Sequence, residues 1–197
     1  MNNIVNLEAF FEPIRKGIIG IDAEFDSPYG KQKTIYADWI ASGRLFEPIE
    51  HRLSNCIGPF VANTHTETTF TGSSMTHAYH QAIKFIKNHV GAHPSDILIS
   101  TGSGMTGVVN KLQRMLGLRI HERFTNRIDL KDDERPIVFI THMEHHSNQT
   151  TWLETIADVE IINPTENGLV DLNHFSELLE KYKQRPLKIA AITSCSN

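Results

Sequence analysis

The feature that most constrains the fold is the alternation of strand and helix patterns in the second half of the chain. From Asp96 onward, apolar runs and amphipathic helical runs follow one another in the order β-α-β-α-β-α-β. Such an order is typical of parallel strands, because each helix returns the chain to the edge where the next strand begins. We therefore expect an α/β fold with a mostly parallel sheet, helices on both faces and right-handed crossovers.

Short apolar runs mark the four expected strands, at residues 97–101, 136–141, 159–162 and 187–193. Helical spacing of apolar residues predicts the helices of this half at residues 105–116, 149–156 and 171–183. A long charged connection, residues 119–135, interrupts the alternation. Connections of this length are uncommon in compact domains, so this one is expected to carry function or to be an insertion.

The first half of the chain has a less regular pattern. Helical spacing predicts helices over residues 6–14, 48–57 and 73–90. Residues 33–40 are expected to form a short strand, and residues 17–30 and 62–71 are expected to be loops.

The composition narrows the class of protein. The chain has 197 residues and a net charge of −4 with acids and bases interspersed, which gives no electrostatic footprint for nucleic acid. No apolar segment is long enough to span a membrane, and the N-terminus lacks a signal-peptide pattern. Cys56 and Cys195 suggest no disulfide framework. We therefore expect a cytoplasmic protein with no membrane or nucleic-acid partner.

The run Ile97–Asn110 has the pattern of an anion site. An apolar strand leads into a turn of small residues, and an amphipathic helix follows. Glycines allow the backbone to approach a ligand closely, and the free N–H groups and dipole at a helix N-terminus favour a phosphate. Ser103 and Thr106 add hydroxyl donors. This turn therefore predicts a phosphate-binding site.

Other interpretations of the same turn remain open. Gly102, Gly104 and Gly107 also fit the G-x-G-x-x-G pattern of dinucleotide-binding proteins. That class needs a second strand soon afterwards that ends in an acidic residue, whereas here the next strand comes after the long connection. A P-loop is excluded because no Gly-Lys-Ser/Thr follows. A glycine turn without a ligand is the further alternative.

Histidines follow the expected strand at residues 136–141. His142 and His146 have the spacing of a helical zinc motif, but Met143 stands where that motif needs a glutamate. The second use of an imidazole at a strand end is to lie flat on a planar cofactor. Loop or packing histidines are the simpler interpretation, so metal binding is not predicted.

Five short motifs are distributed along most of the chain. They are Tyr36-Ala-Asp-Trp-Ile-Ala-Ser42, Ser103-Gly-Met-Thr106, Glu144-His145, His145-His-Ser-Asn-x-x-x-Trp152 and Ser194-Cys-Ser-Asn197. Taken together, in this order and at these expected strand ends, they resemble the class V aminotransferase family. That family includes cysteine desulfurases and selenocysteine lyases, which are fold-type I enzymes that use pyridoxal 5′-phosphate (PLP).

The resemblance implies a role for each matching residue. The backbone N–H groups of Gly104 and Met105 and the hydroxyl of Thr106 would hold the cofactor phosphate. His145, the expected catalytic residue, would stack on the pyridine ring. Asn197 would contact the ring hydroxyl.

The early motif would border the substrate through Ala41 and Ser42. The sequence departs from the family pattern in several places: Thr151 replaces a proline, Met105 is bulkier than the usual alanine, and Gly107 replaces an acidic residue. The family's ring-nitrogen aspartate and Schiff-base lysine would lie beyond the last residue. We therefore expect this chain alone to have no turnover.

We accordingly interpret residues 1–30 as an N-terminal helical segment and residues 31–197 as an incomplete PLP-binding large domain. The whole protein would be a homodimer that acts on an amino acid. The alternatives are a fragment of an NAD(P)-binding oxidoreductase and a non-catalytic interaction partner. The identity of the amino acid and of the cleaved bond depends on residues outside these motifs.

Overall fold

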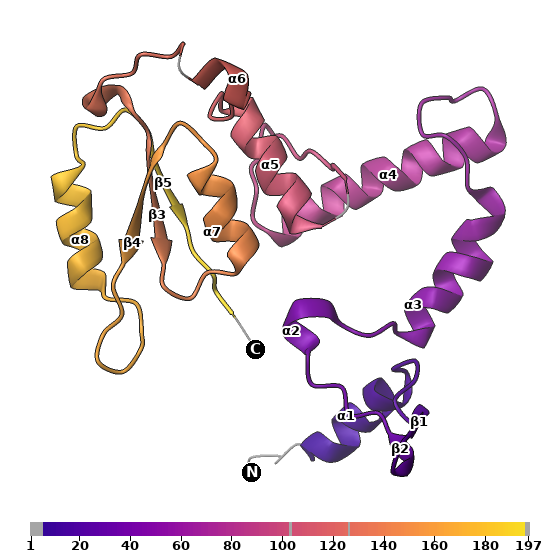
Figure 1. Ribbon diagram of the computed structural model, residues 1–197. Helices are drawn as coiled ribbons and strands as arrows, with labels where there is room; N and C mark the ends of the chain where they lie inside the picture. The colour runs from indigo at the N-terminus through magenta and orange to yellow at the C-terminus, as the bar shows by residue number, and fades with distance from the viewer. Residues whose placement is uncertain (1–5, 103, 126, 196–197) are drawn as a thin grey trace, which may run out of the picture. The chain divides into compact units, whose positions relative to one another are not determined.

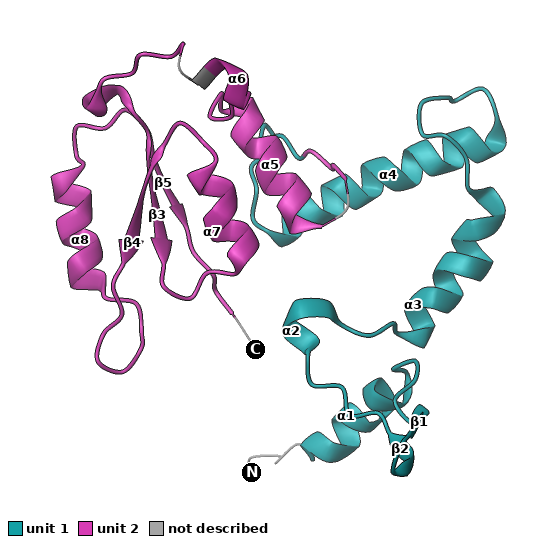
Figure 2. Ribbon diagram, viewed as in Figure 1, with its two compact units in different colours: residues 1–98, 197 teal, residues 99–196 magenta. Residues whose placement is uncertain are grey.

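The computed structural model describes residues 6–102, 104–125 and 127–195 (Figure 1). The chain divides into two compact units, residues 1–98 and residues 99–196 (Figure 2). The assignment of residues 1–30 and 31–197 to separate domains is not addressed by this division and stays a prediction.

The second unit is built on a parallel three-stranded sheet. Its strands are β3 (Ile137–Thr141), β4 (Asp158–Ile162) and β5 (Lys188–Ala191), in the spatial order β4-β3-β5. Both neighbours run parallel to the central strand β3. The predicted α/β fold with a parallel sheet is therefore confirmed.

Helices cover both faces of this sheet. The helices of the unit are α5 (Met105–Met115), α6 (Glu122–Thr125), α7 (His146–Leu153) and α8 (Leu172–Lys181), with a short 3-10 turn at Asp132–Glu134. Figure 1 shows α5 and α7 on one face and α8 on the other. The chain crosses from β3 to β4 through α7, and then in the opposite direction from β4 to β5 through α8. Two crossovers of the same handedness that run in opposite directions across a sheet must pass over opposite faces of that sheet. The unit therefore has three layers, with helices on each side of the sheet.

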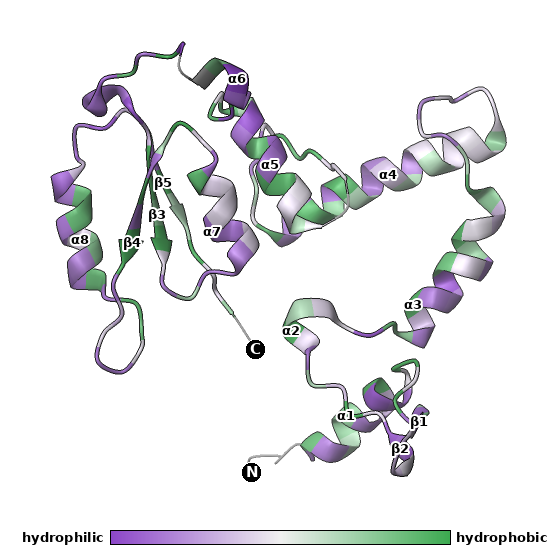
Figure 3. Cartoon of the chain, in the orientation of Figure 1, coloured by the Kyte–Doolittle hydropathy of each residue, from purple (hydrophilic) through white to green (hydrophobic). Residues whose placement is uncertain are grey.

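The core consists of one hydrophobic cluster on each face of β3. This strand is buried along its whole length and hydrophobic in Figure 3, as a central parallel strand should be. Its alternate residues point to opposite faces. The cluster under α7 contains Leu118, Val138, Ile140 and Trp152. The cluster under α8 contains Ile137, Phe139, Ile162 and Leu178.

The first unit is mainly helical. Its elements are α1 (Leu7–Lys16), the hairpin β1 (Glu24–Ser27) and β2 (Gly30–Lys33), α2 (Trp39–Ser42), α3 (Glu47–His51) with its π-helical continuation Arg52–Ile57 and the 3-10 turn Gly58–Phe60, and α4 (Phe70–His89). Asn6 caps α1 as expected, since its side chain accepts hydrogen bonds from two backbone N–H groups of the first turn. The predicted helices over residues 6–14, 48–57 and 73–90 are confirmed in position, with bounds that differ by a few residues.

Three local predictions are wrong. Residues 17–30 are not only a loop, because β1 and the start of β2 form a hairpin there, with Gly30 at a φ of 93°. The strand expected over residues 33–40 is replaced after Lys33 by irregular chain and α2; the Tyr36 hydroxyl lies 2.8 Å from the Ser42 carbonyl oxygen and bends the segment. Residues 97–101 form no strand, and Ile97 is 86% exposed.

The last correction has a simple physical cause. A strand is stable only when neighbouring backbone groups complete its hydrogen bonds. Within the described ranges no strand pairs with residues 97–101, since the sheet of the second unit contains only β3, β4 and β5. The expected alternation therefore begins with α5 in this structure.

Candidate functional site

The candidate site lies where the parallel strands β3 and β5 end. The segment that leaves β3 contains Glu144 and His145, and the segment that leaves β5 contains Thr193. In open α/β sheets, ligands bind outside the carboxyl ends of the strands, at the point where the strand order reverses. Here the first crossover leads from the central strand β3 to β4 on one side of it, and the second leads from β4 back past β3 to β5 on the other side. The strand order therefore reverses at the carboxyl ends of β3 and β5.

Glu144 joins the two strand ends. Its Oε1 accepts hydrogen bonds from the N–H (3.2 Å) and the hydroxyl (2.6 Å) of Thr141, at the end of β3. The same oxygen accepts from the N–H of Thr193 (3.0 Å), beyond the end of β5. Its Oε2 accepts from the Thr193 hydroxyl (2.6 Å) and from Nδ2 of Asn148 (2.7 Å). One carboxylate is therefore held by donors from β3, α7 and the segment after β5.

These contacts keep Glu144 ionised. Partial burial by itself raises the pKa of this carboxyl, but the hydrogen bonds from Thr141, Thr193 and Asn148 favour the charged form more strongly. The net effect lowers the pKa from 4.5 to about 2. Glu144 is thus a fixed negative charge at neutral pH.

Asn148 extends the network to the core. Its Oδ1 accepts a hydrogen bond of 3.0 Å from Nε1 of Trp152, whose side chain is buried in the cluster under α7. Its Nδ2 also lies 3.4 Å from the carbonyl oxygen of Ala191, the last residue of β5. The polar contacts around Glu144 are therefore anchored on a well-packed indole.

His145 begins helix α7. It is the N-cap, and its Nδ1 accepts a hydrogen bond of 3.2 Å from the backbone N–H of Ser147. The Ser147 hydroxyl lies 2.8 Å from the same nitrogen. A neutral imidazole whose Nδ1 accepts carries its proton on Nε2. The ring of this exposed residue is thus oriented by its cap contact.

Helix α5 begins without a side-chain cap. Gly104 is its N-cap with a φ of 82°, a conformation that favours glycine, and it provides no side chain for the first turn. A Cβ atom there would have no neighbour within 4 Å, so the space beside the helix start is open. Met105 and Thr106 are the first two helical residues, and their N–H groups have no partner within the helix. This helix start has the chemistry of an anion site.

Helices α5 and α7 start at the same edge of the sheet. Thr151, five residues after the start of α7, contacts Asn110 and Gln113, five and eight residues after the start of α5. The Thr151 hydroxyl is 3.1 Å from Oε1 of the fully buried Gln113, whose Nε2 donates to the Thr151 carbonyl (3.2 Å). Figure 1 shows the two helices running in the same direction. Their N-termini therefore lie level, and only that of α7 is capped by a side chain.

The remaining predicted residues are distributed as follows. Ala41 and Ser42 are exposed in helix α2 of the first unit, where Oγ of Ser42 lies 2.5 Å from the Tyr36 hydroxyl. Asn197 and Ser103 lie outside the described residues. The structure places His145 beside Glu144, and Asn148 contacts both, with its side chain on Glu144 and its backbone N–H on the His145 carbonyl oxygen (2.8 Å). The roles predicted for Ala41, Ser42 and Asn197 stay predictions.

No metal site is found among the described residues, where no three His, Cys, Asp or Glu side chains gather. Nε2 of His142 instead lies 3.1 Å from the carbonyl oxygen of Gly168. The zinc alternative for the histidines after β3 therefore has no support in this part of the chain.

The sequence interpretation missed the residues that hold the site together. It assigned no role to Glu144, Asn148 or Thr193, although the first two belong to the family-like motifs. The available signal was their position beside His145 and in the His145–Trp152 motif. Thr193 had no comparable signal, because its partner is 49 residues away along the chain.

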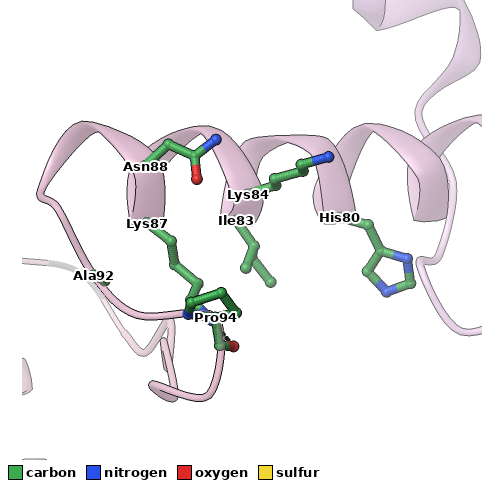
Figure 4. A pocket seen from close by; sticks show the side chains of 7 residues that line it. All are labelled: His80, Ile83, Lys84, Lys87, Asn88, Ala92 and Pro94. Carbon is green, nitrogen blue, oxygen red and sulfur yellow. Dashed lines mark hydrogen bonds between the residues drawn. The ribbon is translucent and has the colours of Figure 1, made fainter.

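A separate hollow of about 380 Å³ lies along helix α4 in the first unit (Figure 4). It is lined by His80, Ile83, Lys84, Lys87, Asn88, Ala92 and Pro94. Nζ of Lys87 donates to the carbonyl oxygens of Pro94 and Asp96, at 2.7 Å each. This lysine therefore fastens the turn after α4, which is a structural use of the charge.

Within residues 6–102, 104–125 and 127–195, no helix is long and apolar enough to cross a membrane.

Comparison with known proteins identifies the family. The chain is similar to the cysteine desulfurase SufS of Plasmodium vivax, with 28% identity over 141 residues. This alignment covers 69% of the chain but 23% of the relative, so the aligned part spans less than a quarter of that protein. The family model of Aminotransferase class-V matches residues 35–197, well over half of the chain. The chain therefore belongs to the class-V aminotransferase family, a family of PLP-dependent enzymes.

Proposed function

We propose that this chain supplies part of the cofactor site of a PLP-dependent enzyme that acts on amino acids, of the cysteine desulfurase or selenocysteine lyase kind. The observation that carries the proposal is the uncapped start of α5 at Gly104, level with the helix start that bears His145. An anion site and an exposed flat ring at one edge of a parallel sheet suit a phosphorylated aromatic cofactor. Family membership supplies the independent support.

The residues present fit the phosphate and the ring. The N–H group of Met105, at the first helical position, and the Gly104 N–H beside it are suited to bind phosphate oxygens, and the Thr106 hydroxyl is a further donor. The Gly104 position has open space where another residue would carry a Cβ. His145 would lie on the ring, oriented by its contact with the Ser147 N–H.

When bound, PLP supplies an electrophilic carbon for the amino group and a conjugated ring that accepts the electrons of the cleaved bond. The residues of this chain bind and orient that group. Asn197 would donate to the ring hydroxyl, and Ala41 and Ser42 would border the substrate. The lysine and the aspartate that the family uses would come from the rest of the whole protein, which we expect to be a cytoplasmic homodimer.

Binding of pyridoxamine 5′-phosphate tests the proposal. This probe keeps the ring and the phosphate but has no aldehyde, so it cannot react with surface lysines. We expect calorimetric titration of the purified chain to detect binding of pyridoxamine 5′-phosphate and much weaker binding of pyridoxamine, which lacks the phosphate.

A glycine pair provides the matched control. Gly104→Ala and Gly117→Ala both place a Cβ at a positive φ (82° and 70°) with open space around it, one before α5 and one after it. Each substitution strains the backbone by about 1 to 3 kcal/mol, and Gly104, with a ψ of 167°, lies in a region that is essentially confined to glycine. Only Gly104→Ala should weaken binding of the probe, by about fivefold or more, because only this change crowds the helix start. Equal effects of the two substitutions would contradict the proposal, and binding of NAD⁺ in place of the probe would favour the dinucleotide alternative.

A further inference from the structure

Glu144 occupies the point where two paired strands separate. The ladder between β3 and β5 ends at the pair Ile140–Ala191. Just beyond it, the backbone N–H groups of Thr141 and Thr193 both donate to Oε1 of Glu144, at 3.2 and 3.0 Å. A side-chain carboxylate therefore continues the connection between the strands after the backbone ladder stops.

The direction of the surrounding hydrogen bonds requires a negative charge at this point. The indole N–H of Trp152 can only donate, so it fixes Oδ1 of Asn148 toward Trp152 and the amide Nδ2 toward Glu144. The Thr141 hydroxyl accepts from the N–H of Met143 (3.3 Å), which leaves its proton for Glu144. Every group that faces the two oxygens is thus set to donate, and a neutral amide would bring its NH₂ group against one of these donors.

The charge also lies beside a residue of the candidate cofactor site. His145 is the next residue in the chain and starts α7, whose Asn148 donates to the same carboxylate. Thr193 lies in the segment that follows β5. Movement of Glu144 would therefore shift the start of α7, and His145 with it, relative to the end of β5.

We propose that Glu144 is a positioning residue of the PLP site: by clamping Thr193 to the start of α7, it holds the imidazole of His145 in place for the cofactor ring. This inference rests on the proposed function. Both oxygens of Glu144 are engaged by Thr141, Thr193 and Asn148, so we expect its effect on binding to be exerted through His145 and not through the phosphate at the start of α5.

The test compares Glu144→Gln with Glu160→Gln in the full 197-residue chain. Glu160 on β4 is also a half-buried carboxylate, bound by Lys181 (2.9 Å) and by the Tyr182 hydroxyl, but it lies within the strand and not at its carboxyl end. Both changes remove one hydrogen-bonded charge. We expect Glu144→Gln to weaken binding of pyridoxamine 5′-phosphate about tenfold and Glu160→Gln to leave it unchanged within about twofold. Affinity for inorganic phosphate should be the same in all three proteins.

A charge exchange provides a second variant that does not depend on the folding of the first. In Glu144→Gln/Asn148→Asp, the carboxylate at position 148 accepts from both the Trp152 indole and the new amide, and the Thr193 hydroxyl can turn to accept from that amide. The weak contact of position 148 with the Ala191 carbonyl oxygen (3.4 Å) is lost in the exchange. We expect this protein to bind pyridoxamine 5′-phosphate within about threefold of the unmodified chain. The shift that the probe causes in the ¹H–¹³C signals of the His145 ring, assigned with His145→Gln, should disappear in Glu144→Gln and return in the exchange.

The outcomes separate the two claims. If the unmodified chain does not bind the probe, the proposed function and this inference both fail. If it binds, and Glu144→Gln binds equally well or the exchange brings no recovery, only the positioning role of Glu144 is refuted. A parallel loss of phosphate and probe affinity would also refute it, because that result indicates general loss of structure.

Discussion

Glu144 makes a quantitative prediction about the pH dependence of stability. Its folded pKa of about 2 lies below the ordinary value of 4.5. A depressed pKa means that the folded state holds the ionised form more favourably than the unfolded state does. The stabilisation is therefore fully present above pH 4.5 and is lost as the pH falls from 4.5 toward 2.

The magnitude follows from the shift. A difference of about 2.5 pKa units (4.5 minus 2) corresponds to about 3.4 kcal/mol at 1.36 kcal/mol per unit. Because the carboxyl is only partly buried, we reduce this to about 2 kcal/mol. About 1.5 kcal/mol of this free energy should be lost between pH 7 and pH 3 by linkage. The destabilisation caused by Glu144→Gln should therefore be about 1.5 kcal/mol smaller at pH 3 than at pH 7.

Urea unfolding followed by Trp152 fluorescence is the appropriate assay. Trp152 is 2% exposed and belongs to the unit that contains Glu144. The second tryptophan, Trp39, lies in the other unit, so the measurement is made in a Trp39→Phe background. Ile140→Val is the control, since it removes a buried methyl group for about 1 kcal/mol and introduces no titrating group. Equal pH dependence for both variants would refute the assignment of a depressed pKa to Glu144.

Three further predictions concern the packing of the second unit, and each is checked by the same unfolding measurement. Leu178→Ala should cost about 3 kcal/mol, because this leucine of α8 is 5% exposed and packs in the cluster under that helix. Asp171→Ala should cost about 1 kcal/mol and Asp171→Asn much less, because the side chain caps α8 by accepting from the N–H groups of Asn173 (2.9 Å) and His174 (3.1 Å). Thr151→Val should cost about 1 to 2 kcal/mol, since it leaves Oε1 of the buried Gln113 without its hydroxyl partner.

The sequence predicts an element of the fold where a single physical requirement, such as burial of both faces of a strand, fixes the residue types. Residues 137–141 are apolar at every position but the last because both faces of β3 are covered, and the strand is buried throughout. The hairpin of β1 and β2 has no such constraint. Its eight residues are almost entirely exposed and mostly polar, so their spacing carries no signal for a buried face. The strand at residues 97–101 was predicted from apolar character alone, and composition does not say whether a pairing partner is present.

The same distinction holds for the site. Gly104 could be identified because a helix start without a side chain has a recognisable local sequence, and the observed φ of 82° agrees with it. His145 was found through its motif. The function of Glu144 could not be derived locally, because its decisive donor, Thr193, reaches it only after two crossovers have brought β5 beside β3. Long-range hydrogen bonds of this kind are set by topology and leave no pattern in the adjacent sequence.

His145 combines two tasks that substitutions can separate. As the N-cap of α7 it needs an acceptor for the Ser147 N–H, and as the proposed cofactor contact it needs a flat ring. His145→Asn retains an acceptor but has no ring, so we expect stability within about 0.5 kcal/mol of the unmodified chain and clearly weaker binding of pyridoxamine 5′-phosphate. His145→Phe retains a ring but cannot accept, so we expect a loss of about 1 kcal/mol in stability with binding largely kept. Urea unfolding and calorimetric titration measure the two effects independently. If His145→Asn binds the probe as well as the unmodified chain, the ring has no part in binding, and the imidazole serves only to start the helix.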